Sequence, residues 1–176
     1  MERTLIDTSI LVEPFVPWKN NEPNYKKICM SLLRGKLNEL NNRWKPVISL
    51  SVLGEYHLLL NEKDIFKRLN EEKLKIMKGI LNVFITGKEK VGIKREVIEI
   101  CNEIIHLDSR IEPLDALHIA TAIAEKCSNF LFIDYGISGN FKLKKFAKNY
   151  NLNLLDFGIK LNADLKRISD GMIWRE

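Results

Sequence analysis

The sequence predicts an α/β protein in which helices cover both faces of a central, mostly parallel sheet, a three-layer α/β/α sandwich. Short apolar segments typical of strands alternate along the chain with segments whose apolar residues recur every three or four positions. The segment 130–133 is Phe-Leu-Phe-Ile, which is typical of a strand covered on both faces. The length of 176 residues suits one domain with a substantial core.

The first part of the chain contains two expected strands, at 3–6 and 46–50. Two prolines make the segment 12–18 irregular, because proline lacks a backbone N–H and restricts the chain. A helix is expected to begin near Pro23, since proline suits the first helical turn. Ser51 can cap a further helix that carries apolar residues at helical spacing.

The rest of the chain continues the alternation of helices and strands. The helix that begins near Pro113 is rich in alanine, so it can pack closely against the sheet. The segment 159–176 is expected to form at most one short helix and a tail. The other expected elements are helices at 64–84, 94–105 and 141–150 and strands at 130–133 and 152–155.

Composition excludes several classes of protein. The net charge is +5, from 28 basic and 23 acidic residues, which permits but does not demonstrate contact with a polyanion. No apolar run reaches the roughly 18 residues of a membrane span, and Asp7 interrupts the stretch that a signal peptide needs. We therefore expect a cytoplasmic protein without membrane attachment.

The cysteines and histidines argue against disulfides and against zinc. Three cysteines are far apart and form no CxxC pair, and three histidines show no HExxH spacing. Any metal chemistry is therefore expected to rely on oxygen ligands.

Four acidic residues are expected to meet at one edge of the sheet. Asp7 and Asp134 each follow a strand, and Glu55 and Asp115 each lie near the start of a helix. In open parallel sheets, ligands bind beyond the carboxyl ends of the strands. Clustered carboxylates repel one another, and a hard divalent cation relieves that repulsion. Such a cation can also activate water, so the pattern predicts phosphodiester hydrolysis.

Each acid also has an ordinary structural explanation when it is taken alone. Asp7 and Asp134 can cap turns, and Asp115 suits the positive end of a helix dipole. Glu55 can be a solvated helix residue, although apolar neighbours place it at the border of the buried face. Only the joint placement of the four acids favours a site.

Four segments resemble, in order, the motifs of the PIN-domain ribonucleases, a family that includes the toxin halves of VapBC toxin–antitoxin pairs. They are Leu-Ile-Asp-Thr-Ser at 5–9, Ser-Val-Leu-Gly-Glu-Tyr at 51–56, Leu-Asp-Ala-Leu-His-Ile-Ala-Thr-Ala at 114–122, and Phe-Ile-Asp at 132–134 followed by Phe141. The chain is thus similar to a single PIN-like nuclease domain over 1–176. The close match covers about 3–157, and the tail 158–176 is unassigned.

The resemblance implies a site and a set of partners. Catalytic and metal-binding roles fall to the four acids, with Mg²⁺ or Mn²⁺ as cofactor, and Thr8 and Ser9 support them by hydrogen bonding. RNA is the implied substrate, a homodimer is the implied assembly, and an antitoxin is the implied partner of toxin members. The four acids are Asp7, Glu55, Asp115 and Asp134.

Basic and aromatic residues are candidates for holding RNA, with solvated helix faces and core packing as the alternatives. His118, one helical turn after Asp115, either meets the site or is a packed histidine. The candidates are Lys142, Lys144, Lys145, Lys148 and His118, then Lys88, Lys90, Lys94 and Arg95, and the aromatic Phe15, Trp18 and Tyr135.

Competing functions differ in what the acids do. The sequence lacks the acid pairs of dehalogenase-type phosphatases and of receiver domains. The remaining alternatives are a PIN scaffold that binds RNA or a protein partner without cutting, and a housekeeping RNA-processing nuclease rather than a toxin.

Overall fold

The computed structural model describes residues 1–15, 24–34, 44–61 and 71–156. The expectations for Trp18, for the start of the helix at 64–84 and for the tail after 158 lie outside these residues. Within them, no helix combines the length and the apolar character needed to cross a membrane.

The described residues form one sheet of five parallel strands in the order β3-β2-β1-β4-β5. The expected strands are present with ends shifted by one or two residues. The three-residue strand β3 is an addition that sequence analysis missed. The strands are β1 (Glu2–Ile6), β2 (Trp44–Ser49), β3 (Glu89–Val91), β4 (Asn129–Phe132) and β5 (Asn153–Asp156).

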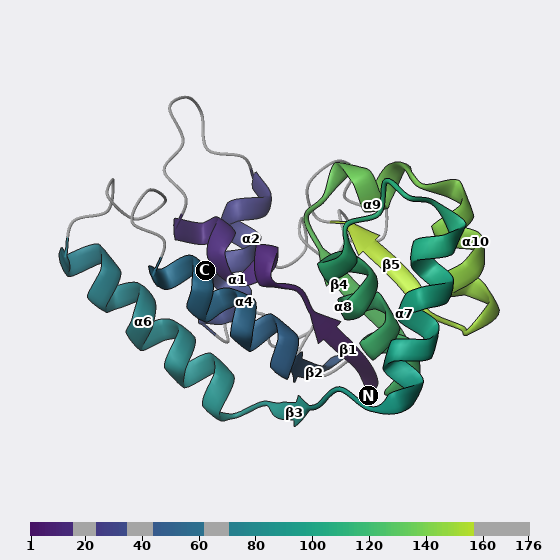
Figure 1. The fold of residues 1–176 in the computed structure, drawn as a ribbon. Helices are drawn as coiled ribbons and strands as arrows, with labels where there is room; N and C mark the ends of the chain where they lie inside the picture. Colours follow the sequence, from purple (N-terminus) through teal and green to yellow (C-terminus); the bar gives the residue numbers. More distant parts are fainter. Residues whose placement is uncertain (16–23, 35–43, 62–70, 157–176) are drawn as a thin grey trace.

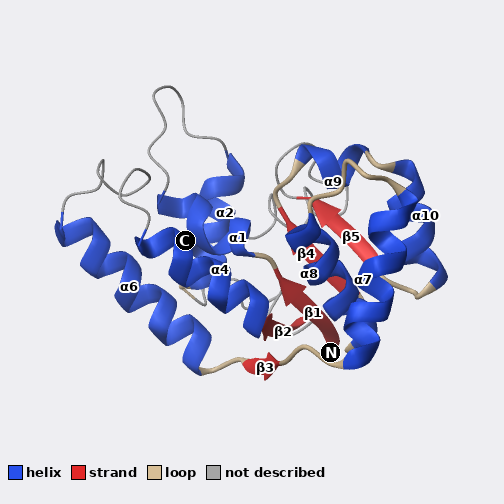
Figure 2. Cartoon of the chain, in the orientation of Figure 1, coloured by secondary structure: helices blue, strands red, loops and turns tan. Residues whose placement is uncertain are grey.

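Helices join the parallel strands, as such connections require. Figures 1 and 2 show α7, α8 and α10 grouped beside β4 and β5, with α1, α2, α4 and α6 on the other side of the molecule. The predicted α/β fold is thus confirmed. The helices are α1 (Thr8–Val12), α2 (Asn24–Leu33), α4 (Leu50–Asn61), α6 (Glu71–Thr86), α7 (Arg95–Leu107), α8 (Pro113–Ala124), α9 (Tyr135–Gly139) and α10 (Phe141–Asn149), with a 3₁₀ turn η1 at Glu13–Phe15.

The structure moves one expected cap and adds two short helices. The chain after β1 is helical at once, because Asp7 caps α1, and the irregular segment expected from residue 12 begins as η1. The helix after β2 is capped by Ser49 rather than Ser51, since the Ser49 hydroxyl accepts the Val52 N–H at 3.1 Å. The segment after Asp134, where the capping alternative allowed a turn, forms the short helix α9.

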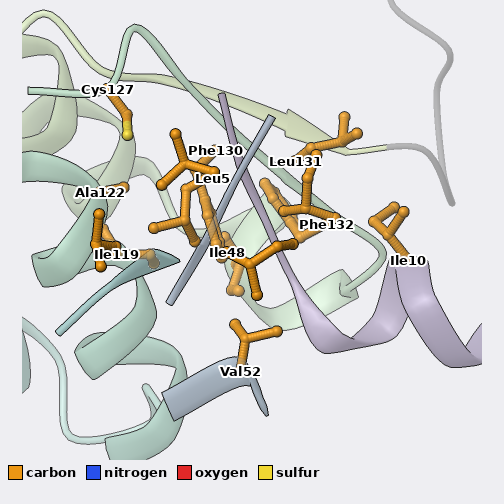
Figure 3. Close-up of a cluster of buried hydrophobic side chains, with 14 of the residues drawn as sticks. Leu5, Ile10, Ile48, Val52, Ile119, Ala122, Cys127, Phe130, Leu131 and Phe132 are labelled. Carbon is orange, nitrogen blue, oxygen red and sulfur yellow. The ribbon is translucent and has the colours of Figure 1, made fainter. Parts of the chain in front are cut away.

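The core lies where the helices cover the strands. All four residues of β4 are buried, as the apolar sequence predicted, and the Phe130 and Phe132 rings stack with centroids 5.4 Å apart. Figure 3 shows Ile119 and Ala122 of α8 and Val52 of α4 around the central strands. The small residues of α8 allow this close packing. The three cysteines are buried and free.

The opposite edge of the sheet, where the strands begin, carries an ion-pair network. Arg3 pairs with Glu89 and, at 3.6 Å, with Glu125. Lys45 lies 2.7 Å from Glu89, and Lys94 lies 2.5 Å from Glu125. This network ties β1, β2, β3 and the end of α8 together, far from the edge where the strands end.

Candidate active site

Asp7 is the central residue of the carboxyl edge, by which we mean the edge of the sheet at which the parallel strands end. The Ser9 N–H donates to Asp7 Oδ2 at 3.0 Å, and the Ser9 hydroxyl donates to the same oxygen. The Ser9 Oγ in turn accepts the Ile133 N–H at 3.0 Å. Ser9 therefore supports Asp7, as the resemblance implied, and also joins the end of β1 to the end of β4.

His118 holds the other oxygen of Asp7. The ring is 1% exposed, and its Nδ1 lies 2.9 Å from Asp7 Oδ1. The sequence allowed either a packed histidine or a histidine at the site; the structure shows one residue that is both buried and bonded to the acid. In the sequence, the only signal for a contact between His118 and the acids was its position one helical turn after Asp115.

Glu55 reaches the same group of residues from α4. Its carboxylate accepts a hydrogen bond from Thr8 Oγ1, and its Oε2 lies 3.8 Å from His118 Nε2. The side chain is 28% exposed, so it is neither fully solvated nor sealed in the core. Thr8 thus supports Glu55 rather than Asp7.

The environment of Asp7 favours its ionised form. Burial alone would raise the pKa of the Asp7 carboxyl, but the hydrogen bond and charge of His118 and the two bonds from Ser9 lower it below its ordinary value. Asp7 is therefore a buried anion whose neighbours supply the donors.

Asp115 lies in the first turn of α8 and has the opposite character. Burial, followed by repulsion from Asp7, Asp134 and Glu112, raises the pKa of the Asp115 carboxyl to about 7. Asp7 and Asp134 act on Asp115 because the structure brings the ends of β1 and β4 and the start of α8 together. Asp7 and Asp134 therefore lie close enough to Asp115 to act on it electrostatically, and the prediction that the three share an ion stays a prediction.

Asp134 has a structural role and faces the site as well. Its Oδ1 accepts the Ile137 N–H at 2.9 Å, so it caps α9. A side chain at Gly136 would place its Cβ 3.0 Å from that oxygen, so glycine lets the carboxylate lie over the helix start. The capping alternative is met by this residue, and its place in a metal site stays a prediction.

The donor set suits a hard divalent cation in kind. The carboxylates repel one another, and only a cation or a proton relieves that repulsion. In the described part of the chain, no three Asp, Glu, His or Cys side chains are arranged around one point that could hold an ion. A magnesium-like ion bound by one or two carboxylates and several waters fits this arrangement. A closed cage of four protein ligands does not.

The helix α10 presents the basic candidates. Lys144, Lys145 and Lys148 are exposed, and Lys142 Nζ bonds the Leu107 carbonyl at 3.4 Å. The helix contains no acid. It begins next to α9, at the edge that carries Asp134.

The other candidates are engaged elsewhere. Lys94 pairs with Glu125 and Arg95 with Glu99, Lys88 lies over the Phe84 ring, and Lys90 bonds two backbone carbonyls. Phe15 packs against the core, the alternative that sequence analysis gave for it. Trp18 and the Tyr135 side chain lie outside the described part of the structure.

Comparison with known families and with curated proteins finds no match to this sequence. The solved structures provide the likeness. The chain shares its fold with FitAcB from Neisseria gonorrhoeae (TM-score 0.55, 17% identity, 88% of this chain and 97% of that one).

Two further structures agree. VapBC2 from Rickettsia felis, bound to a DNA fragment from their promoter, gives a TM-score of 0.56 at 18% identity over 88% of this chain and 99% of that one. FitAB bound to an IR36 DNA fragment gives 0.56 at 17% identity over 89% and 97%. The fold is therefore the PIN-like α/β fold that the motifs predicted.

Proposed function

We propose that this chain is a metal-dependent endoribonuclease of the PIN-domain family that hydrolyses RNA phosphodiester bonds at the carboxyl edge of its sheet. The observation that supports the proposal is that Asp7, Asp115 and Asp134 follow or begin elements at the same edge of the sheet, where burial and then the charges of the other two acids raise the pKa of Asp115. Glu55 joins them through Thr8 and His118. A carboxylate with a strongly shifted pKa beside other acids marks a candidate functional site.

The four acids have different proposed roles in metal binding, which follow from their surroundings. Asp7 is ionised and held by donors, and Asp115 gains most from a bound cation because burial and then repulsion from other acids raise its pKa. These two are the proposed direct ligands, with Asp134 and Glu55 completing the site through water. When bound, Mg²⁺ or Mn²⁺ supplies charge stabilisation and a more acidic water. Ser9 and Thr8 fix the acids in place.

The exposed lysines of α10 are the proposed contacts for the RNA backbone. An anionic substrate approaches acidic residues only when cations outweigh the repulsion. Lys144, Lys145 and Lys148 supply positive charge with no acid on the same helix. Lys142, bonded to the Leu107 carbonyl, lies at the end of the helix nearest the site.

The solved structures favour one biological setting among those that sequence left open. The matched complexes include VapBC2, and the sequence resembles the toxins of such pairs. We therefore propose a toxin that a small antitoxin inhibits and that forms a homodimer. Growth arrest on expression, relieved by a neighbouring small gene, supports this setting; harmless expression favours a housekeeping nuclease.

The proposed activity is tested by RNA cleavage with Mn²⁺ or Mg²⁺. Wild-type protein should cut single-stranded RNA, whereas Asp7→Asn and Asp115→Asn should each lose about a hundredfold or more in rate, since each removes a proposed ligand charge. Glu99→Asn, at an exposed position on α7, is the control. Cleavage that both site variants retain would assign the activity to a contaminant. A folded wild type that binds RNA without cutting it would favour the inactive scaffold.

A further inference from the structure

His118 stands out among the buried polar groups of the described residues because one of its ring nitrogens has no partner. Its Nδ1 lies 2.9 Å from Asp7 Oδ1, but Nε2 is buried and makes no hydrogen bond within the described part of the chain. A buried polar atom left without a partner costs free energy. Packing alone therefore gives no reason for a histidine here, since an apolar side chain would avoid this cost.

The direction of each ring nitrogen is fixed by its neighbours. Asp7 Oδ1 is an acceptor, so Nδ1 carries the proton of that hydrogen bond. The ring then points Nε2 toward Glu55 Oε2, 3.8 Å away. Asp7 follows β1 and Glu55 lies on α4, so one imidazole from α8 spans carboxylates from two other elements.

Hydrogen bonds link three sides of a loop of side chains, and the fourth side is the 3.8 Å approach of His118 Nε2 to Glu55 Oε2, which is not a hydrogen bond. Ser9 holds Asp7 Oδ2, and Thr8 holds Glu55, while Asp7, Thr8 and Ser9 are consecutive in the chain. His118 is the only member of this loop supplied by α8. Without the ring, nothing in the described residues would hold Asp7 Oδ1, and Asp7 and Glu55 would have no common neighbour from α8.

We propose that His118 is a positioning residue of the acidic site, which orients Asp7 through Nδ1–H and sets its spacing from Glu55. This inference rests on the proposed nuclease function and deepens it. The residue touches the carboxylates rather than the reacting atoms. Partners that orient metal-binding carboxylates typically change metal affinity ten- to a hundredfold when removed.

Two substitutions separate positioning from packing. His118→Leu fills the space with apolar atoms and donates nothing, whereas His118→Asn keeps a donor near the place of Nδ1. The readouts are Mn²⁺ affinity, measured from the free-ion signal in electron paramagnetic resonance, and melting temperature. His106→Asn, an exposed histidine on α7, is the matched control.

We expect His118→Leu to weaken Mn²⁺ binding about ten- to a hundredfold and His118→Asn to weaken it less. The melting temperature of each variant shows that it is folded under the conditions of the binding measurement. Equal Mn²⁺ affinities of His118→Leu and His118→Asn would overturn the proposal and leave His118 as a packing residue.

A second measurement needs no metal. Proton NMR of the metal-free protein should show a protected Nδ1–H resonance that is absent in His118→Asn and that moves in Asp7→Asn. An Nδ1–H resonance with the same chemical shift in Asp7→Asn as in the wild type would overturn the proposal. A wild type that shows the bonded ring proton but neither binds Mn²⁺ nor cuts RNA would overturn the proposed function, and the positioning role with it.

Discussion

Neighbouring carboxylates at the carboxyl edge have opposite protonation behaviour. Asp7 gains donors from His118 and Ser9, so its pKa lies below the ordinary value despite burial. Asp115 is partly buried without a comparable donor and faces other acids, so its pKa rises to about 7. Enzymes commonly separate the pKa values of adjacent acids in this way. At neutral pH the metal-free site therefore holds one firmly ionised acid and one that is partly protonated.

The raised pKa of Asp115 makes stability depend on pH. Between about pH 4 and 7 the folded protein keeps a proton that the unfolded chain has released, so the free energy of unfolding falls as pH rises through this window. Asp115→Asn removes the titrating carboxyl and with it this pH-dependent fall in the free energy of unfolding. Its melting temperature should exceed that of wild type by a few degrees at pH 8, since about 1 kcal/mol corresponds to roughly 2–4 °C in a chain of this size.

The comparison is made with EDTA, at pH 8 and at pH 5. At pH 5 the advantage of the variant should shrink, because Asp115 is then mostly neutral in the wild type. An advantage of equal size at both pH values, or a less stable variant at pH 8, would contradict the assigned environment.

At the scale of elements, the edge where the strands end (the carboxyl edge) and the edge where they begin (the amino edge) differ in their charged residues. The carboxyl edge gathers acids that repel one another, whereas the amino edge holds ion pairs around Arg3, Glu89 and Glu125. The helix α8 joins the two edges, since Asp115 is in its first turn and Glu125 follows its last residue. The same helix therefore has mutually repelling acids at its first turn and ion pairs after its last residue.

This division predicts that stability and activity can be changed independently. Glu125→Gln keeps the shape of a buried side chain but removes the charge that Arg3 and Lys94 contact. We expect it to lower the free energy of unfolding by about 1–2 kcal/mol and to leave RNA cleavage at 25 °C unchanged. Urea titration gives the first quantity.

The exposed pair Arg95–Glu99 provides the control for that measurement. Glu99→Gln should change stability very little, because exposed ion pairs contribute little. If Glu125→Gln lowered cleavage as strongly as an Asp7 substitution, the amino edge could not be separate from the site.

The basic face of α10 predicts a salt-dependent contact with RNA. Substituting both Lys144 and Lys145 with Glu, which reverses their charge, should weaken RNA binding about tenfold or more. The slope of binding against salt concentration should also decrease, because fewer counterions are released. Reversing Lys75 and Lys78 on α6 changes net charge equally and is the control. Binding is measured by fluorescence anisotropy at several salt concentrations, with Ca²⁺ in place of Mn²⁺. Equal losses in the two double variants would remove α10 from the interface.

The sequence predicted elements best where a local signal was strong. Proline in the first turn and alanine spacing located α8, and the apolar run at 130–133 located β4 within one residue. The strand β3 was missed because only Val91 of its three residues is buried, and its pairing with β2 is a tertiary feature. The helices α1 and α9 were missed because each has only five residues and depends on an aspartate cap.

At the scale of the whole molecule, parallel strands explain why the site could be foreseen. All five strands end at one edge, so an acid that follows β1 and one that follows β4 must lie near each other. What could not be foreseen is the hydrogen bonding between them. His118 and Asp7 are 111 residues apart, and no local pattern says which ring nitrogen meets which oxygen.

The fold alone does not decide between a nuclease and a binding scaffold, because one fold can support many functions. The matched structures show the shared architecture at 17–18% identity. Function therefore depends on whether Asp7 and Asp115 hold a cation together, with Asp134 and Glu55 nearby.

The most direct test is a crystal structure of the wild-type protein soaked in Mn²⁺, with an anomalous difference map recorded at the manganese edge. We predict a single strong peak beside the carboxylates of Asp7 and Asp115, which is lost in Asp7→Asn crystals. Well-diffracting crystals that show no peak at this edge of the sheet, or a peak that the Asp7 substitution leaves unchanged, would contradict the assignment of these acids to a metal site.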